Sequence, residues 1–157
     1  AQGEQSMIHY LLVFLALLPF YLIGSFPTGR LLAKRQGIDI EKVGSGNVGA
    51  TNVARVLGRK AGLLTLAIDA LKGLLGVIVA RLIFPDERAL CLAALAIVLG
   101  HCFSLPGVLK GGKGVATTLG VLIGLYPPLA IFALLAFSVV FFLSRIVSLS
   151  SISAALF

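Results

Sequence analysis

The chain alternates long apolar runs with short polar segments, a pattern that predicts membrane-spanning helices. The first run, residues 8–28, contains no Asp, Glu, Lys or Arg. Its 21 residues, at about 1.5 Å each in a helix, match the roughly 30 Å hydrocarbon core of a bilayer. We therefore expect a first span here, kinked at Pro19, Gly24 and Pro27.

Two further runs follow a polar segment that covers residues 30–60. Residues 61–84 are long enough to form a second span, although Asp69 and Lys72 lie inside it. Residues 89–109 carry no formal charge and predict a third span.

The last long run, residues 115–144, contains 30 residues without a formal charge. Pro127 and Pro128 lie near its centre, and a proline pair favours a hairpin of two short helices over one overlong helix. Residues 148–157 begin a sixth apolar run that is too short to cross a bilayer. The pattern predicts an all-α, polytopic transmembrane helix bundle with five spans and the start of a sixth.

Composition and charge support this class. The chain is 59% hydrophobic and 12% charged, with a mean hydropathy of +1.07, which excludes an ordinary soluble domain. Its net charge of +7 comes from basic residues in the segments between spans, without interleaved aromatic residues, so we expect no nucleic-acid partner. With the hairpin, ten of the thirteen basic residues fall on one side, which the positive-inside rule makes cytoplasmic.

The polar residues 1–6 precede Met7, and we interpret them as a remnant outside the domain. Residues 7–157 then form a single transmembrane domain. Because the sixth run stops after about ten residues, we expect this domain to be incomplete at its C-terminal end.

Residues 110–119 open an apolar run with a glycine-rich loop that contains Lys110 and Lys113. Successive glycines let backbone N–H groups converge on an anion, and a helix that starts there adds the positive end of its dipole. The spacing is close to that of a nucleotide-binding P-loop, but Gly114 replaces the metal-binding hydroxyl residue and no strand precedes the loop. We therefore predict a phosphate site, with a simple turn as the alternative.

A second glycine-rich segment, residues 44–52, carries hydroxyl and amide side chains on the same side of the membrane. We expect Ser45 or Asn47 to cap a helix that runs through residues 53–57, and Arg55 to offer a planar fork to phosphate oxygens. The alternative is a capped interfacial helix whose Arg55 faces lipid head groups.

Other polar residues in the spans have simpler interpretations. Asp69 and Lys72 are three residues apart, which suggests a mutually satisfied pair that lowers the cost of insertion. His101 suits either a proton shuttle or a hydrogen bond to a neighbouring helix. No carboxylate lies five residues after His101 or His9, so a His/Asp-dependent acyltransferase is disfavoured. The scattered carboxylates suggest neither a metal site nor a cofactor.

Three segments together resemble the motifs of one family. They are residues 44–52 with Arg55, residues 100–101 with 110–117, and residues 147–152. In these segments the chain resembles the PlsY family of bacterial membrane acyl-phosphate:glycerol-3-phosphate acyltransferases, and the resemblance runs from Met7 to the last residue.

The resemblance implies seven transmembrane helices in the bacterial inner membrane, an outside N-terminus and a cytoplasmic active site. It also implies transfer of a fatty acyl group from acyl phosphate to the sn-1 hydroxyl of glycerol 3-phosphate. The products would be lysophosphatidic acid and phosphate, in the first acylation step of phospholipid synthesis. The implied partners are acyl phosphate, glycerol 3-phosphate and membrane lipid, and we expect a monomer.

The site residues are carried over from the matching motifs. The expected catalytic residues are Lys113, Ser45 and Arg55. The expected substrate-binding residues are Asn47, Thr51, Asn52, Lys110, Gly111, Gly112, Gly114, Thr117, His101, Ser148 and Ser151. Phosphate is a good leaving group, so positioning and charge stabilisation matter more than a strong acid or base. On this interpretation the glycine loop holds one phosphate, Arg55 with Ser45 holds the other, and a substrate phosphate oxygen accepts the hydroxyl proton.

Two features differ from the family pattern. Ser104 stands where the family commonly has proline, and the family's C-terminal helices and tail are missing. The alternative functions are a transporter or channel for phosphorylated metabolites, for which no inverted repeat is visible, and a CDP-alcohol phosphotransferase, which needs an aspartate-rich metal site.

Overall fold

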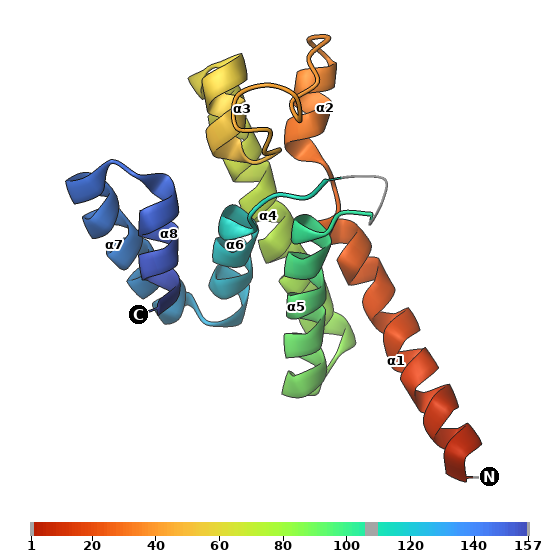
Figure 1. Ribbon diagram of the computed structural model, residues 1–157. Helices are drawn as coiled ribbons and strands as arrows, with labels where there is room; N and C mark the ends of the chain where they lie inside the picture. Colours follow the sequence, from red (N-terminus) through yellow and green to blue (C-terminus); the bar gives the residue numbers. More distant parts are fainter. Residues whose placement is uncertain (1, 106–109, 157) are drawn as a thin grey trace.

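The computed structural model describes residues 2–105 and 110–156, and all regular structure in these ranges is helical. Figure 1 shows the order of the helices along the chain. They are α1 (Gln2–Gly24), α2 (Thr28–Lys34), α3 (Ala50–Leu57), α4 (Arg59–Ile83), α5 (Glu87–Cys102), α6 (Val115–Leu125), α7 (Pro127–Ser144) and α8 (Val147–Leu156).

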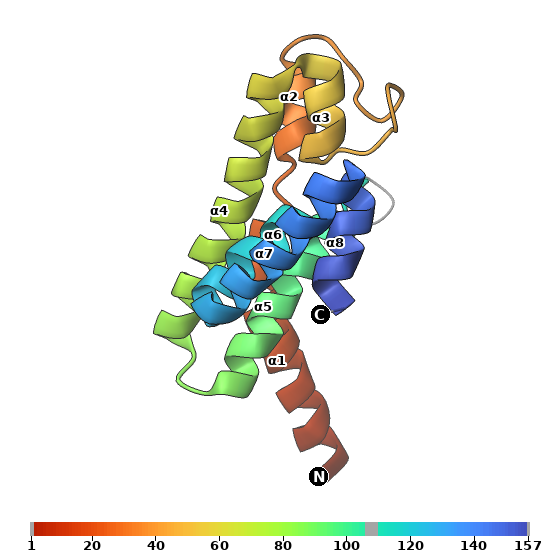
Figure 2. The same ribbon diagram turned by 90° about the vertical axis from the view of Figure 1, so that its left-hand side faces the viewer.

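The long helix α4 is the centre of the bundle and packs against α1, α2, α3, α5 and α6. Its core contacts include Val77, which lies with Phe20 of α1 and Ile97 of α5 in one buried cluster. A second, smaller cluster joins α2, α3 and the loop between them through Ala33 and Val53. The α7–α8 hairpin lies beyond α6, on the side away from α1 (Figure 2). The bundle therefore has a packed body and a more loosely attached hairpin.

Glycines allow the helix backbones to approach closely. A Cβ on Gly120 of α6 would collide with the carbonyl oxygen of Ala70 on α4, and a Cβ on Gly73 of α4 would collide with that of Thr117 on α6. The pair α1–α5 is built in the same way by Gly24 and Gly100. Small residues at helix contacts are the common solution in membranes, where hydrophobic burial between helices adds little.

Helix lengths agree with a membrane protein. The helices α4 and α7 are long and apolar enough to cross a bilayer, and α1 with α2 forms a third candidate that is bent by 42°. The helix α5 has 16 residues, and α6 and α8 are shorter apolar helices. The number of five crossings stays a prediction.

The expected break at Gly24 and the expected hairpin at the proline pair are confirmed, with corrections, whereas helix α1 continues past Pro19. The chain leaves helix α1 at Gly24, and α6 and α7 are separated at Tyr126 beside the proline pair. Only α6 is short, because α7 extends over 18 residues. The polar segment 30–60 is also partly helical, since it contains most of α2 and all of α3.

The third span is shorter than residues 89–109. The helix α5 ends at Cys102, and the chain then turns, with Leu105 in the left-handed region at φ 40°. The hydroxyl of Ser104 donates to the carbonyl of Ser25 at 2.9 Å, which ties this turn to the break after α1. Residues 106–109, including Pro106, lie outside the described residues.

We expect Gly120→Val to destabilise the bundle, because the Cβ of valine and its two methyl groups would be forced against the backbone of α4. Overpacking of this kind costs about 1–3 kcal/mol. The measurement is the thermal unfolding midpoint in detergent. The control is Ala67→Val on the exposed face of α4, which should leave the midpoint within about 1 °C of wild type. Equal midpoints for the two variants would contradict this packing.

Candidate active site

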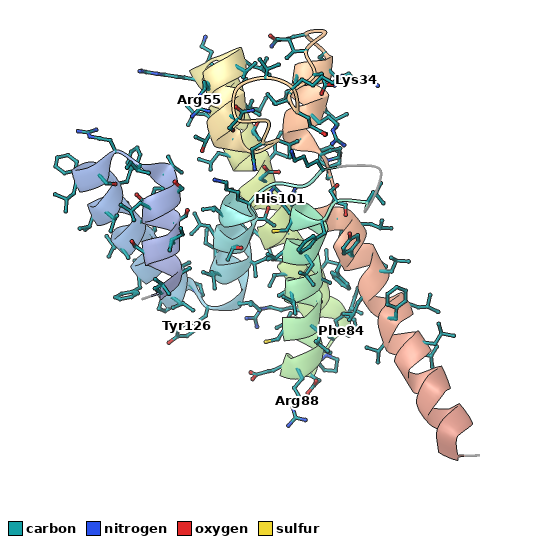
Figure 3. All side chains as sticks on the ribbon, viewed as in Figure 1. Lys34, Arg55, Phe84, Arg88, His101 and Tyr126 are labelled. Atoms are coloured by element: carbon teal, nitrogen blue, oxygen red, sulfur yellow. The ribbon has the colours of Figure 1, made fainter. Side chains whose placement is uncertain are left out.

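The two glycine-rich segments lie at the same end of the bundle. Figure 1 shows the loop between α2 and α3 at the end of the bundle opposite the α4–α5 turn, and the start of α6 as the end of α6 nearer to that loop, about halfway along α4. In Figure 3, Lys34, Arg55 and His101 lie toward this end, whereas Phe84, Arg88 and Tyr126 lie toward the other. Both segments therefore lie toward the same end of the bundle, and their placement on one side of a membrane stays a prediction.

The glycine loop, residues 110–114, is docked on the last turn of α5. The backbone N–H of Gly112 donates to the carbonyl of His101 at 3.0 Å. A Cβ on Gly112 would collide with the ring nitrogen Nε2 of His101, and a Cβ on Gly111 would collide with the carbonyl oxygen of Cys102. Only glycine fits at these two positions.

The loop ends at Gly114, whose φ of +78° is in the left-handed region and which forms the N-cap of α6. Among the residues that the structure describes, no side chain caps this helix end. The first N–H groups of a helix have no intrahelical partner, and such groups suit an anion. The phosphate site stays a prediction.

The loop with residues 44–52 is held together by Asn52. This side chain is 2% exposed, accepts from the N–H of Ser45 at 2.8 Å and donates to the carbonyls of Asn47 and Val43 at 2.9 and 3.1 Å. Gly44 and Gly46 have φ of +64° and +67°, so the loop makes two turns that favour glycine. Asn52 therefore shapes the loop, and its expected substrate contact stays a prediction.

The expected cap of α3 is wrong. The helix begins at Ala50 with Gly49 as its N-cap, and neither Ser45 nor Asn47 donates or accepts a capping hydrogen bond there. Instead the Oδ1 atom of Asn47 accepts from the N–H of Gly49 at 2.8 Å, two residues later, as in an Asx turn. The amide is used to form the turn that precedes the helix.

A small pocket joins the two loops. Val48 of the first loop and Gly111 and Gly112 of the second line it, together with Asp69 and His101. Its accessible volume is about 10 Å³, which is room for roughly one water molecule and too little for a phosphate. The glycine loop separates this small pocket from the start of α6.

Asp69 is the centre of the buried polar cluster below the pocket. Its Oδ1 atom accepts from Lys72 Nζ at 2.9 Å and from the Thr28 hydroxyl at 3.0 Å, and it lies 3.8 Å from Nδ1 of His101. Lys72 Nζ also donates to the carbonyl of Phe26 at 3.0 Å. The predicted pair of Asp69 and Lys72 is confirmed, but it has partners on three other elements.

A large apolar groove begins on the other side of the glycine loop. Its volume is about 650 Å³, and it lies between α6 and the α7–α8 hairpin. The polar residues that line the groove are Lys113, Thr118, Ser148 and Ser151. The remaining lining residues are Leu66, Val115, Ala116, Leu119, Leu122, Ala133, Leu134, Phe137, Ile152, Ala154 and Ala155. The groove is a long apolar site with one ammonium group at the start of α6.

The structure brings some of the expected site residues together and separates others. Lys113, Ser148 and Ser151 all line the groove, and His101, Gly111 and Gly112 all line the small pocket. The expected residues Ser45, Thr51 and Arg55 are exposed on the first loop and α3, and they line neither cavity.

Thr117 and Thr28 are both buried at contacts between helices. Thr117 is completely buried where α6 meets α4, away from both cavities. Thr28 was missed, although a hydroxyl within an apolar run and next to Gly29 was a signal that it faces a polar partner. Among residues 2–105 and 110–156, no group of three or more His, Cys, Asp or Glu is placed to hold a metal ion.

Comparisons with known proteins agree with these motifs. Residues 14–157 match the model of the glycerol-3-phosphate acyltransferase family. The glycerol-3-phosphate acyltransferase of Geotalea daltonii is 51% identical over 135 residues, which cover 86% of this chain and 70% of that protein. That of Aquifex aeolicus is 46% identical over 137 residues, which cover 87% of this chain and 71% of that protein.

A solved structure supports the same assignment. The crystal structure of PlsY (YgiH), an integral membrane glycerol 3-phosphate acyltransferase, in its glycerol 3-phosphate form is similar with a TM-score of 0.84 and 43% identity. The match covers 92% of this chain and 72% of that one. The lysophosphatidic acid form matches with a TM-score of 0.81. The chain is a multi-pass membrane protein that belongs to the glycerol-3-phosphate acyltransferase family.

Proposed function

We propose that this protein transfers a fatty acyl group from acyl phosphate to the sn-1 hydroxyl of glycerol 3-phosphate, giving lysophosphatidic acid and phosphate. Membership of the family establishes the acyl transfer to glycerol 3-phosphate, and the nature of the donor is our inference. The observation that carries it is the position of the glycine loop, which lies between a polar loop and an apolar groove.

The groove fits the acyl chain of the donor. Apolar side chains of α6, α7 and α8 surround it, and burial of each methylene group contributes about 0.8 kcal/mol. Lys113 lies where the groove meets the start of α6, so an acyl chain in the groove places its head group beside an ammonium. A head group that carries negative charge is favoured there.

Phosphate suits this position for two reasons. The start of α6 offers backbone N–H groups and the positive end of the helix dipole, and Lys113 adds a full charge. As the hydroxyl oxygen bonds to the acyl carbon, the bond from that carbon to the phosphate oxygen breaks and negative charge grows on the departing phosphate. The hydroxyl proton passes to a phosphate oxygen of a substrate, so no protein base is required.

The acceptor fits the other loop. Ser45 and Arg55 are exposed on the loop and on α3 at the same end of the bundle, where they are accessible to a water-soluble phosphate. The loop is rigid because Asn52 holds it by several hydrogen bonds. We place glycerol 3-phosphate there, with the site on the cytoplasmic side of the bacterial inner membrane, where most of the basic residues are expected.

The test uses purified protein in detergent with glycerol 3-phosphate and palmitoyl phosphate, and follows release of inorganic phosphate and formation of lysophosphatidic acid. We expect equal amounts of both products. Palmitoyl coenzyme A replaces palmitoyl phosphate in a parallel reaction and should give no product. Activity with the thioester alone would overturn the proposed donor and leave the acyl transfer intact.

We expect Lys113→Ala to lower kcat by at least ~10²-fold, roughly 2.7 kcal/mol, because the ammonium stabilises charge that grows only in the transition state. The measurement is the initial rate with both substrates saturating. Lys110→Ala, on an exposed residue at the start of the loop, should cost much less. Equally small effects would mean that the loop is only a turn.

We expect Arg55→Ala to raise the KM for glycerol 3-phosphate by about tenfold and to change that for palmitoyl phosphate much less, because a bidentate fork suits a terminal phosphate that binds and leaves intact. The matched control is Arg35→Ala, another exposed arginine at the same end of the bundle. An unchanged acceptor KM in Arg55→Ala would remove Arg55 from the acceptor site.

A further inference from the structure

We propose that Thr28 and Asp69 are positioning residues that hold the glycine loop in its active shape through His101. This inference rests on the proposed function, since it concerns the same loop. The two residues lie on α2 and α4, and neither contacts the outer side of the loop where a phosphate can bind.

The cluster joins α2, α4, α5 and the break between α1 and α2. Asp69 Oδ1 receives hydrogen bonds from Thr28 of α2 and Lys72 of α4, and it faces Nδ1 of His101 on α5. Lys72 extends the cluster to the backbone at Phe26, in the break between α1 and α2. A pair that only balanced its charges would need one contact between Asp69 and Lys72.

His101 transmits this order to the loop. One edge of its ring faces Asp69, and Nε2 occupies the space in which a Cβ of Gly112 would lie. Its carbonyl accepts the N–H of Gly112. Rotation of the ring would therefore push directly on the backbone of Gly112, next to Lys113.

Thr28 is the sharpest place to test the network. Its hydroxyl donates to Asp69, the side chain is 4% exposed, and Thr28→Val keeps its shape while removing the donor. Among the described residues, Lys72 is then the one remaining hydrogen-bond donor to Asp69, which is less well fixed toward His101. Thr28→Ser keeps the hydroxyl and tests for rescue.

Two readouts are needed. The first is the KM for palmitoyl phosphate, which we expect to rise about tenfold in Thr28→Val with an unchanged KM for glycerol 3-phosphate. The second is amide hydrogen exchange of the peptide that contains residues 110–114, which should become at least fivefold faster. A lower folded fraction alone would reduce the apparent kcat and leave both KM values unchanged.

The matched control is Thr65→Val. Thr65, on α4, is buried like Thr28. Its hydroxyl donates to the carbonyl of Ala61 in its own helix, away from the Asp69 cluster. We expect wild-type donor KM and loop exchange in Thr65→Val and in Thr28→Ser. If Thr28→Val also has wild-type exchange in residues 110–114, the proposal is overturned, whatever its KM.

A double variant tests whether charge balance is the only role of the pair. Asp69→Leu with Lys72→Leu removes both charges, and such replacements are often tolerated in protein interiors. We expect faster exchange of residues 110–114 in this variant too. If wild-type protein releases no phosphate from palmitoyl phosphate, the proposed donor is wrong, and the exchange measurements still decide whether the network orders the loop.

Discussion

The contact between the glycine loop and the last turn of α5 is the constraint on which the rest of the site depends. The N–H of Gly112 donates to the carbonyl of His101, and Gly112 lies against the ring of His101. A side chain at this position of the loop would collide with that ring. This contact fixes the residue that follows, Lys113, at the start of α6. The outer side of the loop, with the N-terminus of α6, is where we propose that the donor phosphate binds.

Two charged residues lie inside the apolar bundle next to this contact. An isolated carboxylate or ammonium in a membrane is costly, and such residues usually pair with each other and serve a function. Asp69 and Lys72 have side-chain exposures of 4% and 7%. Their hydrogen bonds reach α2 and the break before it, and Asp69 lies 3.8 Å from Nδ1 of His101. The buried charges therefore lie directly beneath the loop that we assign to phosphate.

The outline of the fold could be predicted from the sequence because span length and apolar composition are local properties. Residues 61–84 correspond to α4, and the proline pair marks the start of α7. The end of α5 could not be predicted, because apolar residues continue past Cys102 and the turn depends on a distant contact of Ser104 with Ser25.

The site shows the same division between local and distant information. The glycine loop and Lys113 were predictable because glycines next to a basic residue at a helix start have few other uses. The bond between Thr28 and Asp69 joins residues 41 positions apart, and the partners of Asn52 depend on how its loop folds back. Neither relation has a signature in residue spacing.

The most direct test of the account is to locate the donor with a palmitoyl phosphonate that carries a diazirine at the end of its acyl chain. The phosphonate cannot transfer its chain, so the label reports the bound state before reaction. After irradiation, the account predicts crosslinks to α6, α7 and α8 along the groove, for example at Phe137, and their loss when excess palmitoyl phosphate competes. Crosslinks confined to the exposed faces of α1 and α5 would contradict it.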